Sequence, residues 1–469
     1  MKPNKVVAES EAGANPSPTR IEYPQRPDGD NHKEGRLPAA LRALANRNFK
    51  LFFSGQLISL IGTWMQSVAQ SWLVYRLTGS PVLLGLVGFS SQIPVFLLAP
   101  IGGIVADRKR RHRILIITQS LAMLLALSLA SLTLAGVIKV WHIFVFAAML
   151  GVINSFDIPA RQAFIVDMVG KENLINAIAL NSSMFNGARI IGPAVAGVLV
   201  AVIGEAWCFF ANGASYIAVI AGLLMMKVET RPRASRTGSP LADIIEGFKF
   251  AGQVRPVRAL LLLLGLVSIA GMPYAVLMPI IADRVLQGGA SGLGILMGAS
   301  GVGALAGALS LVGRKGVAGL GRWVAFSCAG FGASLILFSL SRTFWLSAVL
   351  LIPAGLFMMV QMASSNTLIQ TMVPDHLRGR VMAVYSMMFM GMAPLGSLMA
   401  GVLAGRLGAP GTVAAGGAVC MAGASIFASR LPALRTQARE LIVAQQMVGG
   451  DPPEHALNSS IPGRQDSTT

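Results

Sequence analysis

The segment GGIVADRKRRHR, residues 102–113, places one carboxylate and five cationic side chains in a short link. Apolar runs of about 20 residues, long enough to cross a bilayer as helices, flank the link on both sides. Only 12% of the 469 residues are charged and 54% are hydrophobic, whereas a soluble domain carries about 25% charged residues. This alternation of apolar runs and charged links predicts a membrane protein with many spans.

Apolar runs and polar links along the chain predict twelve spans. They lie at residues 50–75, 82–106, 114–136, 141–160, 178–203, 206–226, 257–282, 291–313, 322–341, 343–370, 380–406 and 410–430. The longest link, 227–256, contains RPRASRTGSP, a polar stretch that cannot be buried in lipid. We therefore expect an all-α membrane fold with six-helix bundles at 49–226 and 257–430. Residues 1–48 are expected to form a disordered cytoplasmic tail, and residues 431–469 a second tail with a short surface helix.

Lysine and arginine are distributed unevenly between the two sides of these spans. With the N-terminus in the cytoplasm, about 32 of them fall in cytoplasmic segments and about 5 in the opposite loops. Cytoplasmic loops of membrane proteins carry this excess of positive charge. The distribution predicts that both termini are cytoplasmic, and it accounts for the net charge of +18 without a nucleic-acid partner.

The two predicted bundles are related in sequence. Residues 191–199 read IGPAVAGVL and residues 395–403 read LGSLMAGVL, so a glycine and the string AGVL recur at a constant offset of 204 residues. Such internal repeats are typical of transporters, whose substrate site lies between the repeats. The repeat predicts pseudo-symmetric bundles with a central site.

The segment at 102–113 resembles the loop motif of the major facilitator superfamily, Gly-x-x-x-Asp-Arg/Lys-x-Gly-Arg/Lys-Arg/Lys. Gly103 matches the first glycine, Asp107 the acid, Arg108 the following cation and Arg111 a later basic position. The resemblance implies that these residues gate the cytoplasmic side, and Arg161 at the end of span 4 is the expected partner of Asp107. The alternative is a basic loop that only orients the chain in the membrane.

Residues 159–197 resemble the branch of this superfamily that contains the enterobactin exporter and macrolide-efflux proteins. The match rests on RQA at 161–163, NA at 176–177, LNS at 180–182, AR at 188–189 and GP at 192–193. The resemblance implies secondary transport, by alternating access, in the bacterial inner membrane. Gly192 and Pro193 also resemble the span-5 motif of antiporters, which implies a helix kink; helix packing alone is the alternative.

Polar side chains within the spans are the candidates for a substrate cavity. In span 1 they follow one helical stripe, because their spacing alternates between three and four residues. A polar stripe in lipid must face protein or water; hydrogen bonding between helices is the alternative to a cavity lining. The candidates are Gln56, Ser59, Thr63, Gln66 and Gln70 in span 1, Gln92 in span 2, Ser182 and Asn186 in span 5, Tyr274 in span 7, and Gln361 and Asn366 in span 10.

Arg189 and Asp157 are charged residues inside predicted spans. A cation near the middle of the bilayer costs at least ~2.5 kcal/mol, so Arg189 must face a partner or a wet cavity. It either contacts an anionic or catecholate-like cargo or has a structural role, for which pairing with Asp157 is one possibility. Asp157 is our candidate for proton coupling, because a carboxylate is costly to keep charged at this depth.

Other chemistries are not expected from this sequence. Cys208, Cys328 and Cys420 lie in separate spans, and no group of histidines or carboxylates has metal-ligand spacing. A phosphate-binding loop is absent from the sequence, so ATP handled by this chain does not supply the energy. We expect a monomeric transporter without cofactors. We expect it to export a siderophore or a drug-like molecule, driven by the proton gradient. An importer or facilitator of the same fold and a polytopic protein without transport activity are the alternatives.

Overall fold

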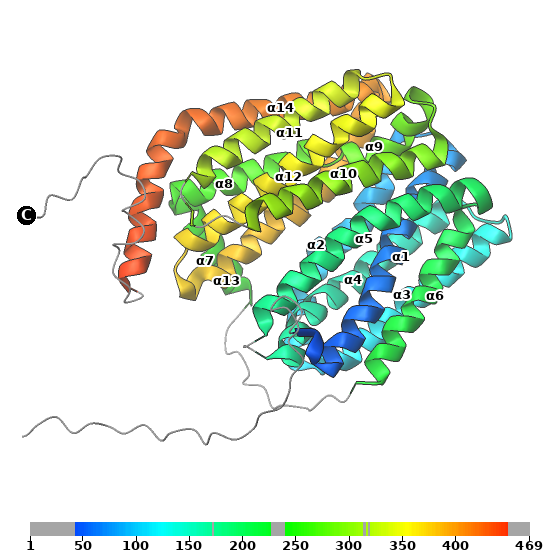
Figure 1. Cartoon of the computed structure of the whole chain (residues 1–469), viewed down its shortest axis with the longest axis horizontal. Helices are drawn as coiled ribbons and strands as arrows, with labels where there is room; N and C mark the ends of the chain where they lie inside the picture. The colour runs from blue at the N-terminus through cyan, green and yellow to red at the C-terminus, as the bar shows by residue number, and fades with distance from the viewer. Residues whose placement is uncertain (1–42, 171–172, 227–239, 313–315, 318, 449–469) are drawn as a thin grey trace, which may run out of the picture. The chain divides into compact units, whose positions relative to one another are not determined.

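The computed structural model describes residues 43–170, 173–226, 240–312, 316–317 and 319–448, and every regular element in these ranges is a helix (Figure 1). The described residues belong to one compact unit. The predictions for residues 1–42 and 449–469, and for the Arg-rich part of the central link at 227–239, lie outside the described residues.

The first bundle contains six helices. They are α1 (Arg47–Thr78), α2 (Pro81–Arg108), α3 (Arg111–Leu134), α4 (Val140–Val169), α5 (Leu174–Ile203) and α6 (Glu205–Leu224). The Asn46 side chain caps α1 by accepting hydrogen bonds from two backbone amides, and the Ser80 side chain caps α2 by accepting one from the Leu83 amide. The sequence placed the end of span 4 at residue 160, but α4 continues to Val169, because Phe164 and Met168 are buried in this extension.

The second bundle is less regular than the first. Its elements are α7 (Pro240–Gln253), α8 (Arg255–Leu266), η2 (Val267–Gly271), α9 (Tyr274–Ile280), η3 (Ile281–Val285), α10 (Gly289–Val312), α11 (Leu320–Leu340), α12 (Phe344–Met372), α13 (Asp375–Ser386), η4 (Met387–Gly391) and α14 (Met392–Val448). The elements α8 to η3 form one span. Two wide π-type turns interrupt it, η2 before α9 and η3 after α9. Proline rings remove backbone donors here, at Pro273 and Pro279.

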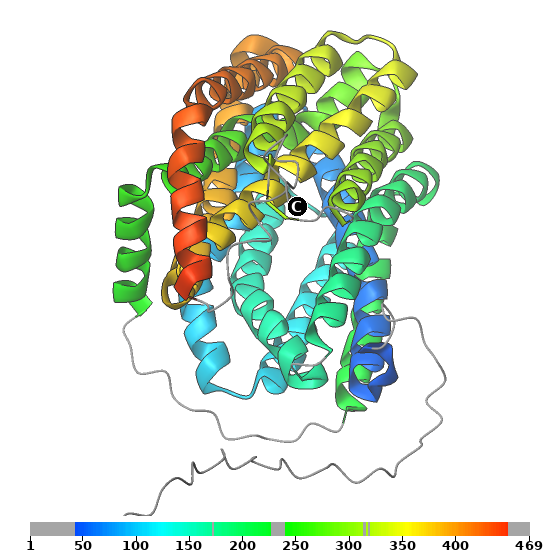
Figure 2. The ribbon, with the colours of Figure 1, turned by 60° about the vertical axis from the view of Figure 1, so that its left-hand side comes forward.

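Twelve spans can be counted in the described residues. Ten stretches are long and apolar enough to cross a membrane, and the last of them runs over Asp375–Val443. Gly408, with a left-handed φ of 73°, breaks α14 and divides this last stretch into two spans. The twelfth is α1, which carries the polar stripe. Helix α7, inside the segment expected to be a link, packs on α13 and α8 and lies at the outer edge of the second bundle in Figure 2.

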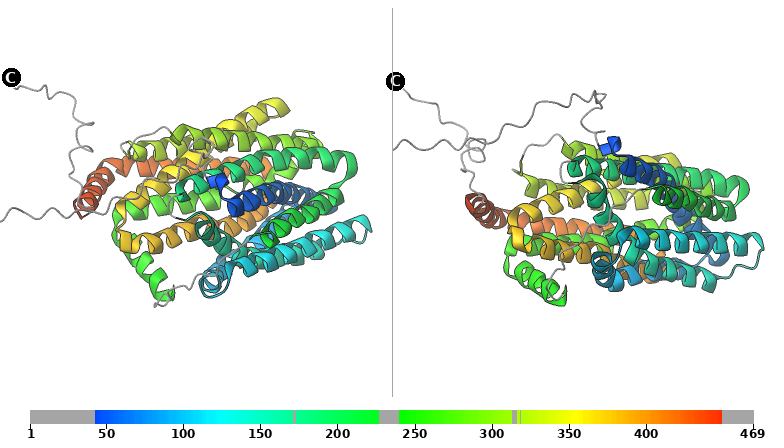
Figure 3. Two further views of the ribbon diagram at one scale, coloured as in Figure 1. Left: turned by 60° about the horizontal axis from the view of Figure 1, so that its bottom comes forward. Right: turned by 90° about the horizontal axis from the view of Figure 1, so that it is seen from below.

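The two bundles are related by pseudo-symmetry, as the repeat predicted. Helix α2 packs on α14 across the interface, and α5 packs on α10. A Cβ atom added at Gly85 would lie 3.0 Å from the Gly401 Cα atom, and one added at Gly197 would lie 2.9 Å from the Gly294 Cα atom. Both crossings therefore depend on facing glycines, which allow the helix backbones to approach closely. The long helices of both bundles run roughly along a common direction, whereas α7 and the C-terminal part of α14 run across it (Figure 3).

The glycine contacts between the bundles lie toward one end of the helices. We call the end with residues 108–113 the basic end, and the opposite end, with Gly79 and Gly288, the closed end. The crossings at Gly85 and Gly197 lie in the half of α2 and α5 nearer the closed end, and Phe96 against Gly391 is a deeper contact. Cβ atoms added at Gly103, Gly187 and Gly379, nearer the basic end, would meet nothing within 4 Å. Glycine packing between the bundles thus favours the closed end.

Candidate functional site

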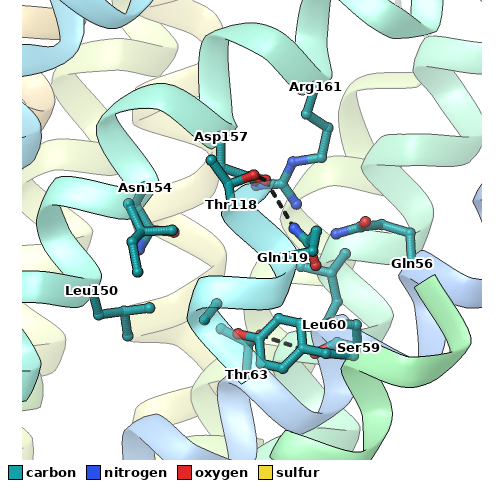
Figure 4. Close-up of a pocket in the computed structure, with 13 residues that line it drawn as sticks. Gln56, Ser59, Leu60, Thr63, Thr118, Gln119, Leu150, Asn154, Asp157 and Arg161 are labelled. Atoms are coloured by element: carbon teal, nitrogen blue, oxygen red, sulfur yellow. Dashed lines mark hydrogen bonds and ion pairs between the residues drawn. The ribbon is translucent and has the colours of Figure 1, made fainter. Parts of the chain in front are cut away.

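A polar pocket of about 60 Å³ lies inside the first bundle, between α1, α3, α4 and α6 (Figure 4). A volume of this size has room for a few water molecules. Gln56, Ser59 and Thr63 of the predicted stripe line it, and so do Asp157 and Arg161 of α4. The structure therefore joins part of the predicted cavity lining to the predicted proton-coupling residue.

Asp157 is the centre of the contacts around this pocket. Its Oδ1 atom accepts hydrogen bonds from the Thr118 hydroxyl group at 2.9 Å and from the Gln119 amide at 2.8 Å. Its Oδ2 atom lies 3.2 Å from Arg161 Nη2, one helical turn further along α4. Both carboxylate oxygens are thus engaged, and the buried charge has a cationic partner, as burial of a carboxylate requires.

Two polar atoms beside Asp157 are buried and have no hydrogen-bond partner among the described residues. They are the side-chain oxygens of Gln56 and Gln119, and both residues line the pocket. Buried polar atoms of this kind cost free energy unless a partner arrives. A water molecule, a proton on Asp157 or a polar cargo group in the pocket could supply that partner.

The sequence analysis did not identify Thr118, Gln119 and Asn154, which also line this pocket. Thr118 and Gln119 lie near the start of predicted span 3, and the sequence analysis assigned them no role. Asn154, Asp157 and Arg161 are spaced by three and four residues, so they share one face of α4. This spacing could have predicted the cluster from the sequence.

Arg189 and its neighbours lie outside this pocket, on α5. The Arg189 guanidinium carbon lies 5.8 Å from the centre of the Trp64 ring, and among the described residues no carboxylate forms an ion pair with Arg189. Pairing with Asp157, one possibility left by the sequence, is therefore not observed. Ser182 is exposed, and Asn186 is buried with its amide donating to the Ser182 carbonyl oxygen at 2.9 Å.

The remaining cavity candidates are dispersed rather than gathered in one cavity. Gln66 is buried and accepts a hydrogen bond from Asn212 at 2.6 Å, and Gln70 is half-buried. Gln92 shares a face of α2 with Gly88 and Phe96, which contact the second bundle. In the second bundle the Tyr274 and Ser300 hydroxyl groups are 2.7 Å apart, Gln361 is buried, and Asn366 accepts from Gln370.

The expected pairing of Asp107 with Arg161 is not observed in this conformation. Asp107 instead lies 3.3 Å from Arg111, which is one turn away, and Arg161 is engaged by Asp157. Arg111 also donates to the Ala163 carbonyl oxygen at 2.9 Å and contacts Asp167 at 3.1 Å. Arg111 therefore ties α2, α3 and α4 together within the first bundle.

Gly103 makes no close helix contact, because a Cβ atom added there would meet nothing within 4 Å. Its neighbour Gly102 does make such a contact, because any Cβ atom there would collide with the Ser155 carbonyl oxygen of α4. Arg108 is exposed at the end of α2. Gating by Gly103, Asp107, Arg108 and Arg111 stays a prediction for a conformation in which the basic end closes.

In α5, Gly192 and Pro193 lie within one continuous helix. A Cβ atom at Gly192 would lie 2.5 Å from the Trp64 Cβ atom, so this glycine lets α5 pack closely on α1. The Pro193 carbonyl oxygen faces Gly294 of α10. The packing role is thus observed, and the kink stays a prediction.

At the closed end, three residues missed by the sequence analysis connect the bundles. The Tyr75 hydroxyl group of α1 donates to Asp283 Oδ2 of η3 at 2.6 Å. The adjacent Arg284 places its guanidinium carbon 5.6 Å from the centre of the Tyr75 ring. These residues are 208 positions apart in sequence, so local patterns gave no signal of the contact.

Comparison with known proteins defines the class of this transporter. The chain matches the MFS_3 family, described as "Transmembrane secretion effector", over residues 39–455. It therefore belongs to this family of the major facilitator superfamily, as the sequence motifs indicated, and it is a membrane transporter rather than an enzyme.

Characterised relatives cover most of the chain. It is 30% identical to the staphyloferrin A transporter of Staphylococcus aureus over 76% of this chain and 90% of the relative. It is 26% identical to the enterobactin exporter EntS of Shigella boydii, over 72% of this chain and 80% of the relative. It is 25% identical to the multidrug efflux pump Tap of Mycolicibacterium fortuitum, over 74% and 87%.

Solved structures of other transporters share the fold. A bacterial homologue of the iron transporter ferroportin, in an inward-facing state, superposes with a TM-score of 0.62 at 17% identity, over 82% of this chain and 98% of that one. The nucleoside transporter NupG superposes with a TM-score of 0.61 at 14% identity, over 86% and 99%. At these identities the likeness concerns the fold alone.

Proposed function

We propose that this protein exports a siderophore-like or drug-like small molecule across the bacterial inner membrane, driven by proton entry. Relatives named as a staphyloferrin A transporter, an enterobactin exporter and a multidrug efflux pump support this cargo class. Export through this fold requires a site between the bundles that opens alternately to each side of the membrane.

The observation that carries the proposal is the concentration of cross-bundle glycine packing toward the closed end. The basic end holds the Lys/Arg-rich links, and such links favour the cytoplasmic side. With the basic end in the cytoplasm, both termini are cytoplasmic and this conformation faces inward. An exporter in this conformation receives its cargo from the cytoplasm, and the Tyr75–Asp283 hydrogen bond helps to hold the outer side closed.

Asp157 is the residue we assign to proton coupling. It is a buried carboxylate, and its cationic partner Arg161 lies in the same pocket. Protonation of Asp157 would release Arg161 from the ion pair and change the charge and hydrogen bonding of the pocket. If this change favours one of the two conformations of the transporter, it links proton binding to cargo movement. We propose that a single chain suffices, because the pocket lies within one bundle.

The proposal is tested by deleting the gene and measuring small molecules inside and outside the cells. We expect at least one secreted compound or drug to accumulate in the deletion strain, and expression of the protein to restore its export. Everted membrane vesicles then measure uptake of that compound with and without a proton gradient. Unchanged metabolite levels and drug susceptibility would contradict export. Uptake into cells would favour an importer or facilitator of the same fold.

A further inference from the structure

Arg189 is the residue whose charge is least explained by the contacts around it. It lies fifteen residues after Leu174 and fourteen before Ile203, the two ends of α5, which is about 22 Å from each end at the helical rise of about 1.5 Å per residue. A guanidinium at this depth is costly and calls for a partner or a wet environment. The group that Arg189 binds therefore bears on the function of the protein.

Arg189 faces the interior of the protein rather than lipid. Ile191 and Val198 follow it by two and nine residues, about 200° and 180° around the helix, and their side chains are 46% and 60% exposed on the outer surface of α5. Gly192 packs on α1, whereas Ile190 packs on α10 of the second bundle. Arg189 consequently points between α1 and α10, at the junction of the two bundles.

In the part of the chain that the structure describes, no carboxylate neutralises Arg189. Asp157, the nearest candidate from the sequence, has both oxygens engaged by Thr118, Gln119 and Arg161. The contact that the structure gives the Arg189 guanidinium is the face of Trp64. A guanidinium has five N–H donors and no acceptor, so its donors remain available to an anion, and a carboxylate or phenolate matches them best.

Aromatic rings surround the same position. Phe185, one turn before Arg189, meets Trp64 edge to face with 5.6 Å between the ring centres, and Phe185 is 47% exposed. Exposed Ser182 lies two turns before Arg189 on its face of the helix, toward the basic end. Closer to the closed end, Ile190 and Pro193 already pack against α10. A ligand that enters from the basic end would therefore meet Arg189 where the packing between bundles begins.

We propose that Arg189 and Trp64 form a binding site for the anionic group of an aromatic cargo, with Arg189 binding a carboxylate or phenolate and Trp64 stacking on the ring. This inference rests on the proposed export function for its biological role, but the binding itself can be measured without transport. It separates two tasks within the first bundle: Arg189 selects the cargo, and Asp157 with Arg161 handles the proton.

Equilibrium dialysis of the purified full-length protein in detergent tests the site. The probes are salicylate and its neutral counterpart salicylamide, which differ in charge but have nearly the same shape. We expect salicylate to bind saturably and more tightly than salicylamide. Because charge-assisted hydrogen bonds are lost, Arg189→Gln should weaken salicylate binding by at least about 10-fold and leave salicylamide binding unchanged. Arg189→Lys should have an intermediate affinity for salicylate.

Two further variants separate the site from general effects of charge and folding. Arg342→Gln removes the same charge from an exposed position at the closed end and should bind both probes as the wild type does. Trp64→Leu should weaken both probes by about 5-fold, because it removes stacking and not charge. Retained salicylamide binding shows that Arg189→Gln is folded.

The proposal would be overturned if salicylate failed to bind the wild type saturably, or if Arg189→Gln bound salicylate as tightly as the wild type does. An equal loss of both probes in Arg189→Gln, with Arg189→Lys equally impaired, would also overturn it in favour of a structural role. These outcomes leave the export proposal standing, since export is measured in cells. Conversely, absent export with intact salicylate binding would contradict the proposed function alone.

Discussion

Asp157 in the first bundle corresponds to Gln361 in the second, at the offset of 204 residues that also relates Gly197 to Gly401. An offset of 209, which relates Gly85 to Gly294, likewise relates Thr118 of α3 to Ser327 of α11. The two bundles thus place polar side chains at matching positions on matching helices. In the first bundle these side chains surround a charged pair, whereas in the second they are neutral.

The two clusters also differ in how their hydrogen bonds are made. Asp157 has a partner on each oxygen. In the second bundle, side-chain atoms of Ser327, Gln361, Ser364 and Ser365 are buried without a partner in the described structure. Both bundles thus carry polar side chains at matching positions, but of these two clusters only that of the first bundle contains a carboxylate, Asp157. We therefore expect proton coupling to depend on the first bundle.

The largest effect is expected from removing the charge of Asp157. In everted vesicles, Asp157→Asn should reduce proton-driven cargo accumulation to the level of vesicles without the protein, because an amide cannot exchange a proton. Gln361→Leu, at the matching position of the second bundle, should retain accumulation. Equal losses in the two variants, or full accumulation by Asp157→Asn, would contradict the division between the bundles.

The next effect concerns stability. Arg161→Gln leaves Asp157 buried without its cation and should lower the free energy of unfolding by about 3 kcal/mol, measured by denaturant titration in mixed micelles. Ser365→Ala, at the matching position, removes an unpartnered hydroxyl group and should leave stability unchanged or raise it by about 1 kcal/mol. Adding Asp157→Asn to Arg161→Gln should restore most of the loss. A loss in Ser365→Ala as large as that in Arg161→Gln would contradict the comparison.

A smaller effect is expected at the closed end. Tyr75→Phe removes one hydrogen bond to a carboxylate, worth about 1.5 kcal/mol, and should shift the equilibrium toward the conformation open at that end by about 10-fold. Distances between spin labels on the two bundles measure this shift. Tyr385→Phe is the matched control, because its hydroxyl group bonds Met362 within the second bundle. Identical distance distributions in Tyr75→Phe and wild type would show that this hydrogen bond does not hold the end closed.

The smallest change in stability is expected from Asp107→Asn. The Asp107 side chain is 55% exposed, and ion pairs of exposed carboxylates contribute less than about 1 kcal/mol. If Asp107 gates the basic end in the other conformation, transport should nevertheless slow in this variant. Transport at the wild-type rate would contradict gating by Asp107. The contacts by which Arg111 holds α2, α3 and α4 together would then be the remaining role of the motif.

The spans and the repeat could be predicted from the sequence, because length, hydropathy and offset are local properties. The predicted bounds of α2, for example, differ from the observed ones by two residues or fewer at each end. Pairings between side chains could not be predicted with the same success. Arg161 was assigned to Asp107, but Asp157 competes for it from one turn away on the same helix.

Contacts between the bundles were beyond the reach of the sequence for a different reason. Tyr75 and Asp283 meet because two helices from different bundles converge at the closed end, and no periodicity in either helix reports that convergence. The polar stripe of α1 was predicted from the sequence. In the structure Gln56, Ser59 and Thr63 line the pocket, whereas Gln66 accepts a hydrogen bond from Asn212. Which face of a helix meets which neighbour is a tertiary property.

The most direct test of alternating access compares distances at the two ends of the same molecule. Gly103→Cys with Gly379→Cys labels the basic end on both bundles at positions with open space around them, and Val137→Cys with Arg342→Cys labels the closed end. Electron spin resonance then measures each distance with and without cargo and at different pH values. We predict that the basic-end distance shortens whenever the closed-end distance lengthens. Two distances that stay fixed, or that change in the same direction, would contradict the account.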